Sequence, residues 1–235
     1  MPKISLDLDL SWPQKGDKLF VSGTDPENDA LLNRGERTLD QYAVGYKLGA
    51  DTLVDKVIEN GLQHDFLVLP IAFLYRQYFE LRLKEMIDSA YRLAVVGFIP
   101  SPQPVFWEQW KSRVSERLHN SGITYPAGPK GHDLHTLWTD EVRPLIEAVF
   151  PTTAGDDLDA VEACIREFQE ADPGGDGFRY PVTKKGLKTL QGLSRVNVRE
   201  FKETVHRIGA LLEGVSEGLA VYRQIHRDMN EDGYP

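Results

Sequence analysis

Apolar positions recur with helical spacing over most of the chain. Residues 39–60 place apolar side chains three and four positions apart and end before Gly61, which is typical of a helix with a glycine cap. The same spacing predicts a second helix over residues 64–96, with Pro70 marking either a kink or a later start. Further core helices are predicted over 134–149, 156–170 and 197–227. The pattern therefore favours a mainly α fold, arranged as an antiparallel helical bundle.

Alternation with a period of two replaces the helical spacing near the N-terminus. Residues 4–10 alternate apolar and polar side chains, and residues 18–23 form a second short extended segment after a turn. The two segments predict a small N-terminal β-hairpin. We therefore expect two parts: residues 1–35 as a hairpin and loop packed on the bundle, and residues 36–235 as the helical domain.

Proline and glycine gather in one internal stretch, residues 98–131. It contains five prolines and three glycines, and a short helix is predicted within it over residues 105–118. Long insertions of this kind either cover a binding site or connect two core helices over the surface. Both interpretations stay open, and the surface connection is preferred.

The helix that contains Leu74 to Ile87 is apolar around most of its circumference, yet it carries a row of polar side chains. Arg76, Glu80, Lys84 and Gln77 fall at roughly 0°, 40°, 80° and 100° on a helical wheel. A helix with so much apolar surface is expected to be buried, and buried charges need partners. The row is therefore either a self-satisfied network that fixes the helix in place or the floor of a pocket that holds an anion.

Composition narrows the classes of function. The chain has 235 residues, a net charge of −9 and a pI near 5.2, which argues against broad, non-specific binding to nucleic acid. The single cysteine, Cys164, cannot form an internal disulfide. No basic start precedes an apolar run at the N-terminus, and no uncharged apolar stretch reaches the ~18 residues of a membrane span. We therefore expect a cytoplasmic protein with no membrane contact.

Two further polar clusters are candidates for joining this row. His132 and Asp133 open the helix predicted after them, where free backbone N–H groups favour anions and Asp133 can act as a cap. Arg179 and Tyr180 lie in the turn FRYP, where an arginine between aromatics can clamp a carboxylate or phosphate. Structural alternatives are a cap or hinge for His132 and an internal salt bridge of Arg179, to Glu80 or Asp172.

These motifs together resemble a family. FLYRQYFELRLKEMI, GHDLHTLW and FRYP before a long last helix are similar to motifs of bacterial HEPN-like helical-bundle proteins, over about residues 40–215. The resemblance implies an antiparallel bundle of four to five helices, often dimeric, in toxin–antitoxin or phage-defence systems. Members are metal-independent ribonucleases, nucleotide-binding proteins or structural proteins. This chain has Gln77 where the family pattern has histidine, so a proton-transfer role at that position is lost.

HEPN ribonucleases carry an arginine followed by a histidine after four to six residues, so that arginine stabilises the phosphorane and histidine moves a proton. Two pairs fit the spacing, Arg199 with His206 and Arg113 with His119. A chain of this composition gives roughly one such match by chance, so position has to decide between them. Arg199 and His206 fall on one face of the last predicted helix and are the preferred catalytic candidates.

Three classes of function remain. The preferred one is a non-catalytic HEPN-like module that binds a nucleotide, another anion or a partner protein, with Arg76, Gln77, Glu80, Lys84, His132, Arg179 and Tyr180 as candidate ligand-binding residues. The alternatives are a metal-independent endoribonuclease acting on RNA through Arg199 and His206, and a structural adaptor without a ligand. We expect no cofactor and no metal site, since His132 and His135 lack an evident third ligand. The expected assembly is a homodimer.

Overall fold

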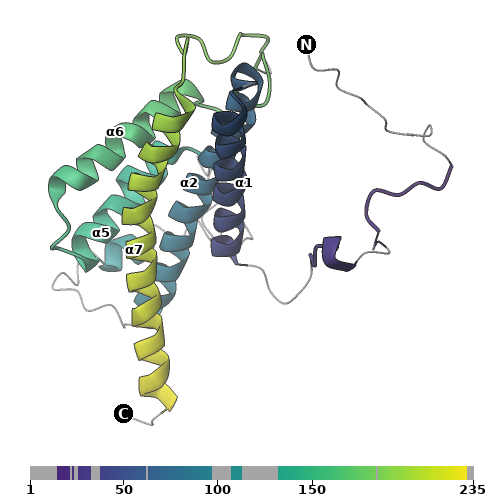
Figure 1. Ribbon diagram of the computed structural model, residues 1–235. Coiled ribbons are helices and arrows are strands. Elements are labelled where there is room, and N and C mark those ends of the chain that lie inside the picture. Colours follow the sequence, from purple (N-terminus) through teal and green to yellow (C-terminus); the bar gives the residue numbers. More distant parts are fainter. Residues whose placement is uncertain are drawn as a thin grey trace. The chain divides into compact units, whose positions relative to one another are not determined.

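The computed structural model describes residues 15–21, 23, 26–32, 38–61, 63–96, 107–112, 132–183 and 185–231. The chain divides into two compact units, Met1–Arg37 and Thr38–Pro235. Mainly helical structure, as predicted, accounts for most of the described residues (Figure 1). None of the described helices is long and apolar enough to cross a membrane.

The first unit has little regular structure among its described residues. A single 3-10 turn, Pro26–Asn28, is followed by Asp29, whose carboxylate accepts a hydrogen bond from the backbone N–H of Gly23 at 2.9 Å. The described part of the predicted second strand, residues 18–21 and 23, is not a strand, and the predicted first strand, residues 4–10, lies outside the described residues. The packing of residues 1–35 on the bundle stays a prediction.

The first two long helices form an antiparallel pair. Helix α1 spans Leu39–Asn60, as predicted, between a capping box formed by Thr38 and Gln41 and a left-handed Gly61 whose N–H donates to the carbonyl of Val57. Helix α2 spans His64–Val95 and runs through Pro70, so the later start considered for this helix is wrong. The short turn between them brings α2 back along α1 (Figure 1).

The next predicted helix, 134–149, is present but contains a change of winding. It consists of α4 (Leu134–Thr136), a π-helical segment η2 (Leu137–Val142) and α5 (Arg143–Val149). Pro144 has no N–H to donate to the previous turn, and the N–H of Arg143 bonds to Trp138, five residues back. The proline therefore accounts for the wider turn that precedes it. Asp133 caps the start, as predicted, by accepting from the N–H of Thr136 at 2.8 Å.

Two more helices complete the bundle. Helix α6 spans Gly155–Ala171 and helix α7 spans Val198–Glu231, close to the predicted 156–170 and 197–227. Residues 107–112 are also helical, and the rest of the predicted insertion helix lies outside the described residues. The loop between α6 and α7 contains one isolated antiparallel bridge, Val182 to Lys188.

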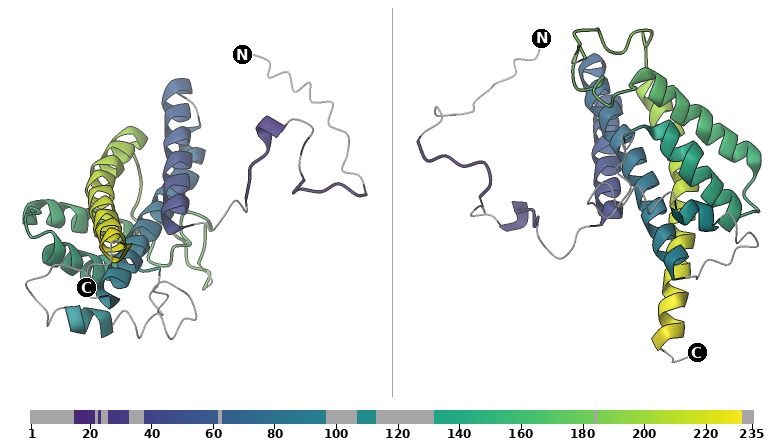
Figure 2. Two further views of the ribbon diagram at one scale, coloured as in Figure 1. Left: turned by 90° about the horizontal axis from the view of Figure 1, so that it is seen from below. Right: turned by 180° about the vertical axis from the view of Figure 1, so that it is seen from behind.

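Helix α2 is the centre of this arrangement. It contacts α1, α7 and η2, while α6 contacts α4 and η2 (Figures 1 and 2). Its side chains form much of the core, with Tyr75, Tyr78, Phe79, Leu83, Met86 and Ile87 all buried. The prediction that this helix is buried is confirmed. Helix α7 packs close to it because residue 209 is glycine: a Cβ there would lie 2.8 Å from the hydroxyl oxygen of Tyr78.

Candidate functional site

The predicted row of charges on α2 is buried. Arg76, Glu80 and Lys84 are 1%, 3% and 6% exposed. Glu80 lies between the other two: its Oε2 is 3.2 Å from Nη1 of Arg76 and its Oε1 is 2.7 Å from Nζ of Lys84. We call these three residues, together with His132 and Asp172, the polar seam.

His132 connects the seam to the chain that leads into α4. Its Nδ1 lies 2.7 Å from Oε1 of Glu80, and because a carboxylate only accepts, Nδ1 carries the proton of this bond. Its backbone carbonyl accepts from Nη2 of Arg76 at 2.7 Å. The ring itself is largely exposed. The seam therefore fixes both the backbone and the side chain of residue 132 on α2.

Asp172 joins the seam from the loop after α6. Its Oδ1 accepts from the backbone N–H of Gly177 at 2.7 Å, and its Oδ2 lies 3.6 Å from Nε of Arg76. The guanidinium of Arg76 also lies flat against Gly175, where a Cβ would stand 3.0 Å from Nη1. Gly175 has φ +71°, so both the backbone and the available space require glycine at this position.

The electrostatics of the seam are balanced. Burial by itself raises the pKa of Glu80, but the ammonium of Lys84 and the hydrogen bond from His132 outweigh it and hold the pKa below its ordinary value. Arg76 and Lys84 supply two positive charges, and Glu80 and Asp172 supply two negative ones. These four charges cancel. Glu80 and the carbonyl of His132 accept hydrogen bonds from Arg76 and Lys84, whereas Nε of Arg76 and Oδ2 of Asp172, 3.6 Å apart, have no hydrogen bond to any described residue. This arrangement locks α2 to two loops.

The other predicted ligand-binding residues lie outside the seam. Gln77 is half-buried, and its side chain has no hydrogen bond to any described residue. Arg179 donates to the carbonyl of Gly175 at 3.2 Å and 3.1 Å. It also forms the internal salt bridge that was considered for it, but with Asp176 rather than with Glu80 or Asp172. Its guanidinium also lies 5.4 Å from the ring centre of Phe73 and 5.5 Å from that of Tyr180, which is exposed.

The predicted catalytic pair lies on the exposed side of α7. Nε2 of His206 is 2.8 Å from Oδ1 of Asp51 on α1, and the same oxygen accepts from the buried hydroxyl of Tyr75 at 2.7 Å. Burial raises the pKa of Asp51, but the hydrogen bonds from Tyr75 and His206 outweigh this effect and hold the pKa below its ordinary value, so the carboxylate stays ionised. His206 is therefore oriented by a fixed anion, with the ring 42% exposed.

Arg199 does not share these contacts. It is exposed, and its side chain has no hydrogen bond or ion pair with any described residue. Seven residues separate it from His206, which places the two on one face of α7, as predicted, without a contact between them. The alternative pair, Arg113 and His119, lies outside the described residues.

Sequence reasoning missed a second network, which joins the buried Arg82 and Glu85 of α2 to α1 and α7. Nη1 of Arg82 lies 2.7 Å from Asp40, and the hydroxyl of Ser216 donates to Glu85 at 2.6 Å. Ser89 donates to the other oxygen of Glu85 at 2.7 Å. One signal pointed to it: Arg82 and Glu85 stand three residues apart within an otherwise apolar helix. Neither Asp51, the partner of His206, nor Tyr75, which donates to Asp51, had a comparable signal.

Among the described residues, no group of three or more histidine, cysteine, aspartate or glutamate side chains could hold a metal ion. Comparisons of the chain with protein-family models, with curated proteins and with solved structures found no match.

Proposed function

We propose that this protein is a HEPN-like interaction module without catalytic activity, which acts as a homodimer in a bacterial defence or toxin–antitoxin type of system. The family part of the proposal rests on the sequence motifs. The observation that carries the interaction part is the C-terminal end of α7. Leu219 is buried, none of residues 220–230 is buried, and the helix continues to Glu231.

That end of α7 carries an apolar stripe. Val221, Ile225 and Met229 are 57%, 42% and 48% exposed, and their spacing of four residues places them on one face. In Figure 1 this end of α7 extends past the other labelled helices. A helical extension of three turns is marginal without tertiary contacts, so a surface that covers the stripe would stabilise it. A second copy does this symmetrically, because a two-fold axis places the same stripe on both partners.

The polar seam supports a structural role rather than an anion site. An incoming nucleotide phosphate would have to displace Glu80 or Asp172 from Arg76, and it would meet both carboxylates at close range. The part of the seam that an anion could reach is the exposed ring of His132. The structure therefore supports a module that binds only protein better than a module that binds a nucleotide.

The dimer proposal predicts that Ile225→Glu dissociates the protein. The new charge would face its own copy across the two-fold axis in a surface that has to lose water, so we expect self-association to weaken by about a hundredfold. Sedimentation velocity over a range of concentrations measures this. Leu48→Glu places the same charge at an exposed apolar position on α1 and should leave the dimer intact. A wild type that sediments as a monomer at all concentrations would overturn the homodimer.

One observation favours a second candidate, the metal-independent endoribonuclease. A half-exposed histidine oriented by a partly buried carboxylate is what a general base requires, and His206 has this arrangement through Asp51. Arg199 on the same helix face would then stabilise charge on the phosphate.

The ribonuclease candidate predicts that His206→Ala lowers cleavage of a pool of structured RNAs in EDTA by at least about a hundredfold. Gel analysis of the products measures it, and His226→Ala, also on α7, serves as the matched control and should cleave like the wild type. No cleavage by the wild type, or an unchanged rate in His206→Ala, would exclude this candidate and leave the interaction module.

A further inference from the structure

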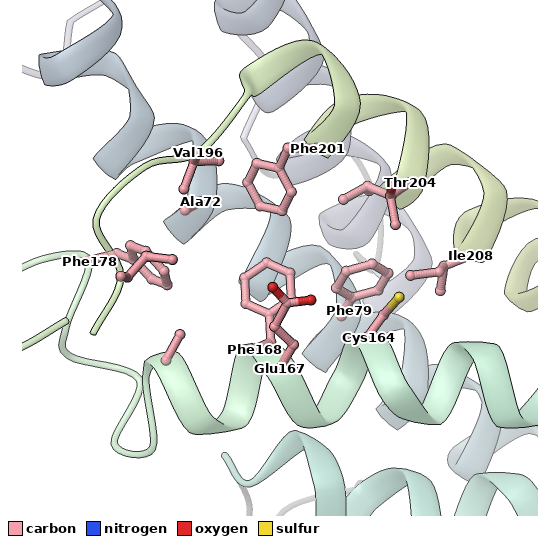
Figure 3. Close-up of a pocket in the computed structure, with 13 residues that line it drawn as sticks. Ala72, Phe79, Cys164, Glu167, Phe168, Phe178, Val196, Phe201, Thr204 and Ile208 are labelled. Atoms are coloured by element: carbon pink, nitrogen blue, oxygen red, sulfur yellow. The ribbon is translucent and has the colours of Figure 1, made fainter. Parts of the chain in front are cut away.

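A cavity of about 120 Å³ lies between α2, α6, α7 and the loop that joins the last two helices (Figure 3). The rings of four phenylalanines line it: Phe79, Phe168, Phe178 and Phe201. The cavity opens to solvent on one side, where the exposed Glu167 and Leu193 line it. An apolar cavity of similar volume holds a molecule such as benzene. The size and the lining therefore match one aromatic ring.

Polar groups lie along one side of this cavity. Glu167 extends from α6 toward α7, and Thr204 stands opposite on α7 (Figure 3). The hydroxyl of Thr204 accepts from Nη2 of Arg207 at 2.8 Å, which directs that guanidinium to the hydroxyl. Glu167 is exposed, and its carboxylate has no ion pair with any described residue. The cavity thus combines an apolar interior with the carboxylate of Glu167 at the rim, while the guanidinium of Arg207 lies at the hydroxyl of Thr204 near the same rim.

We propose that this cavity binds a small molecule made of one aromatic ring and a short chain that ends in an ammonium group. The ring would occupy the space between the four phenylalanines, and the ammonium would pair with Glu167 at the rim. The net charge of −9 favours the approach of a cation over that of an anion. This site is separate from the polar seam and from the stripe on α7, so it does not rest on the proposed dimer.

Cys164 provides a direct readout, because it lines the cavity and is the single cysteine of the chain. Burial raises the pKa of its thiol, so alkylation by iodoacetamide is slow and is best followed in mildly alkaline buffer. A ligand that fills the cavity would cover the thiol and slow the reaction further. Benzylamine is the probe, with toluene as its uncharged analogue and benzoate as its anionic one.

We expect benzylamine to slow alkylation of Cys164 saturably, and benzoate to have no effect at the same concentration. Glu167→Gln should weaken benzylamine binding about tenfold, the equivalent of 1.4 kcal/mol, and leave toluene binding unchanged. Ala72→Leu adds side-chain volume at the cavity wall and should abolish the protection of Cys164, while cooperative unfolding shows that the variant is folded. If this variant fails to fold, Ala171→Leu fills the cavity from α6 instead. Absence of saturable protection, protection that persists in a folded filled variant, or equal protection by benzoate would overturn the proposal.

Discussion

Replacing Arg76 by methionine is expected to lower the free energy of unfolding by about 3–5 kcal/mol. Methionine keeps most of the side-chain length and the apolar packing but removes the guanidinium. Glu80 and Asp172 would then stay buried without their shared cation, and the carbonyl of His132 would lose its donor. Most of the cost comes from the charges left behind rather than from the pairs that are lost.

Urea unfolding followed by circular dichroism measures this difference. The matched control is Arg166→Met, which removes an arginine from an exposed pair with Glu162 and should change the free energy by no more than about 0.5 kcal/mol. A loss below about 1 kcal/mol in Arg76→Met would mean that the seam does not hold α2 to the two loops.

The second expected effect is a stability difference that depends on pH. Glu80→Gln keeps the shape of the side chain and removes its charge, and at pH 7 it should cost about 3 kcal/mol because Arg76 and Lys84 lose their shared anion. The pKa of Glu80 is lowered from its ordinary value of 4.5. Its contribution is therefore complete above the pKa of the unfolded chain and disappears as the pH falls through the lower pKa of the folded protein.

The difference in the free energy of unfolding between the wild type and Glu80→Gln should stay constant down to about pH 5. Below that pH it should shrink to zero, since a protonated Glu80 is nearly equivalent to glutamine. Urea midpoints between pH 7 and pH 3 give this gap directly. Introducing His132→Asn into both proteins removes the imidazole of the seam, and Asp172 is the same in both proteins. Glu108→Gln, at an exposed surface pair, should show no gap at any pH. A gap that widens on acidification would contradict the assigned role of Glu80.

The polar seam shows which contacts the spacing of residues within one helix can predict and which it cannot. The helical wheel placed Arg76, Glu80 and Lys84 in one row, and both contacts within that row are between residues four apart. It could not tell a binding pocket from a closed network. That distinction depends on Asp172 and on the carbonyl of His132, which reach Arg76 from distant parts of the chain. The same limit explains Arg179, which pairs within its own loop rather than with the seam.

The sequence alone determined the helices, since apolar spacing and end caps are local properties; Thr38, Gly61 and Asp133 fix helix ends within a few residues of themselves. It also determined that α2 is buried with its charges. The tertiary structure decided everything that joins separate elements: the balance of charge in the seam, the pairing of His206 with Asp51 across 155 residues, and the cavity between the four phenylalanines. The periodicity of apolar residues indicates which face of a helix is buried. Which residues that face contacts depends on how the helices pack in the tertiary structure.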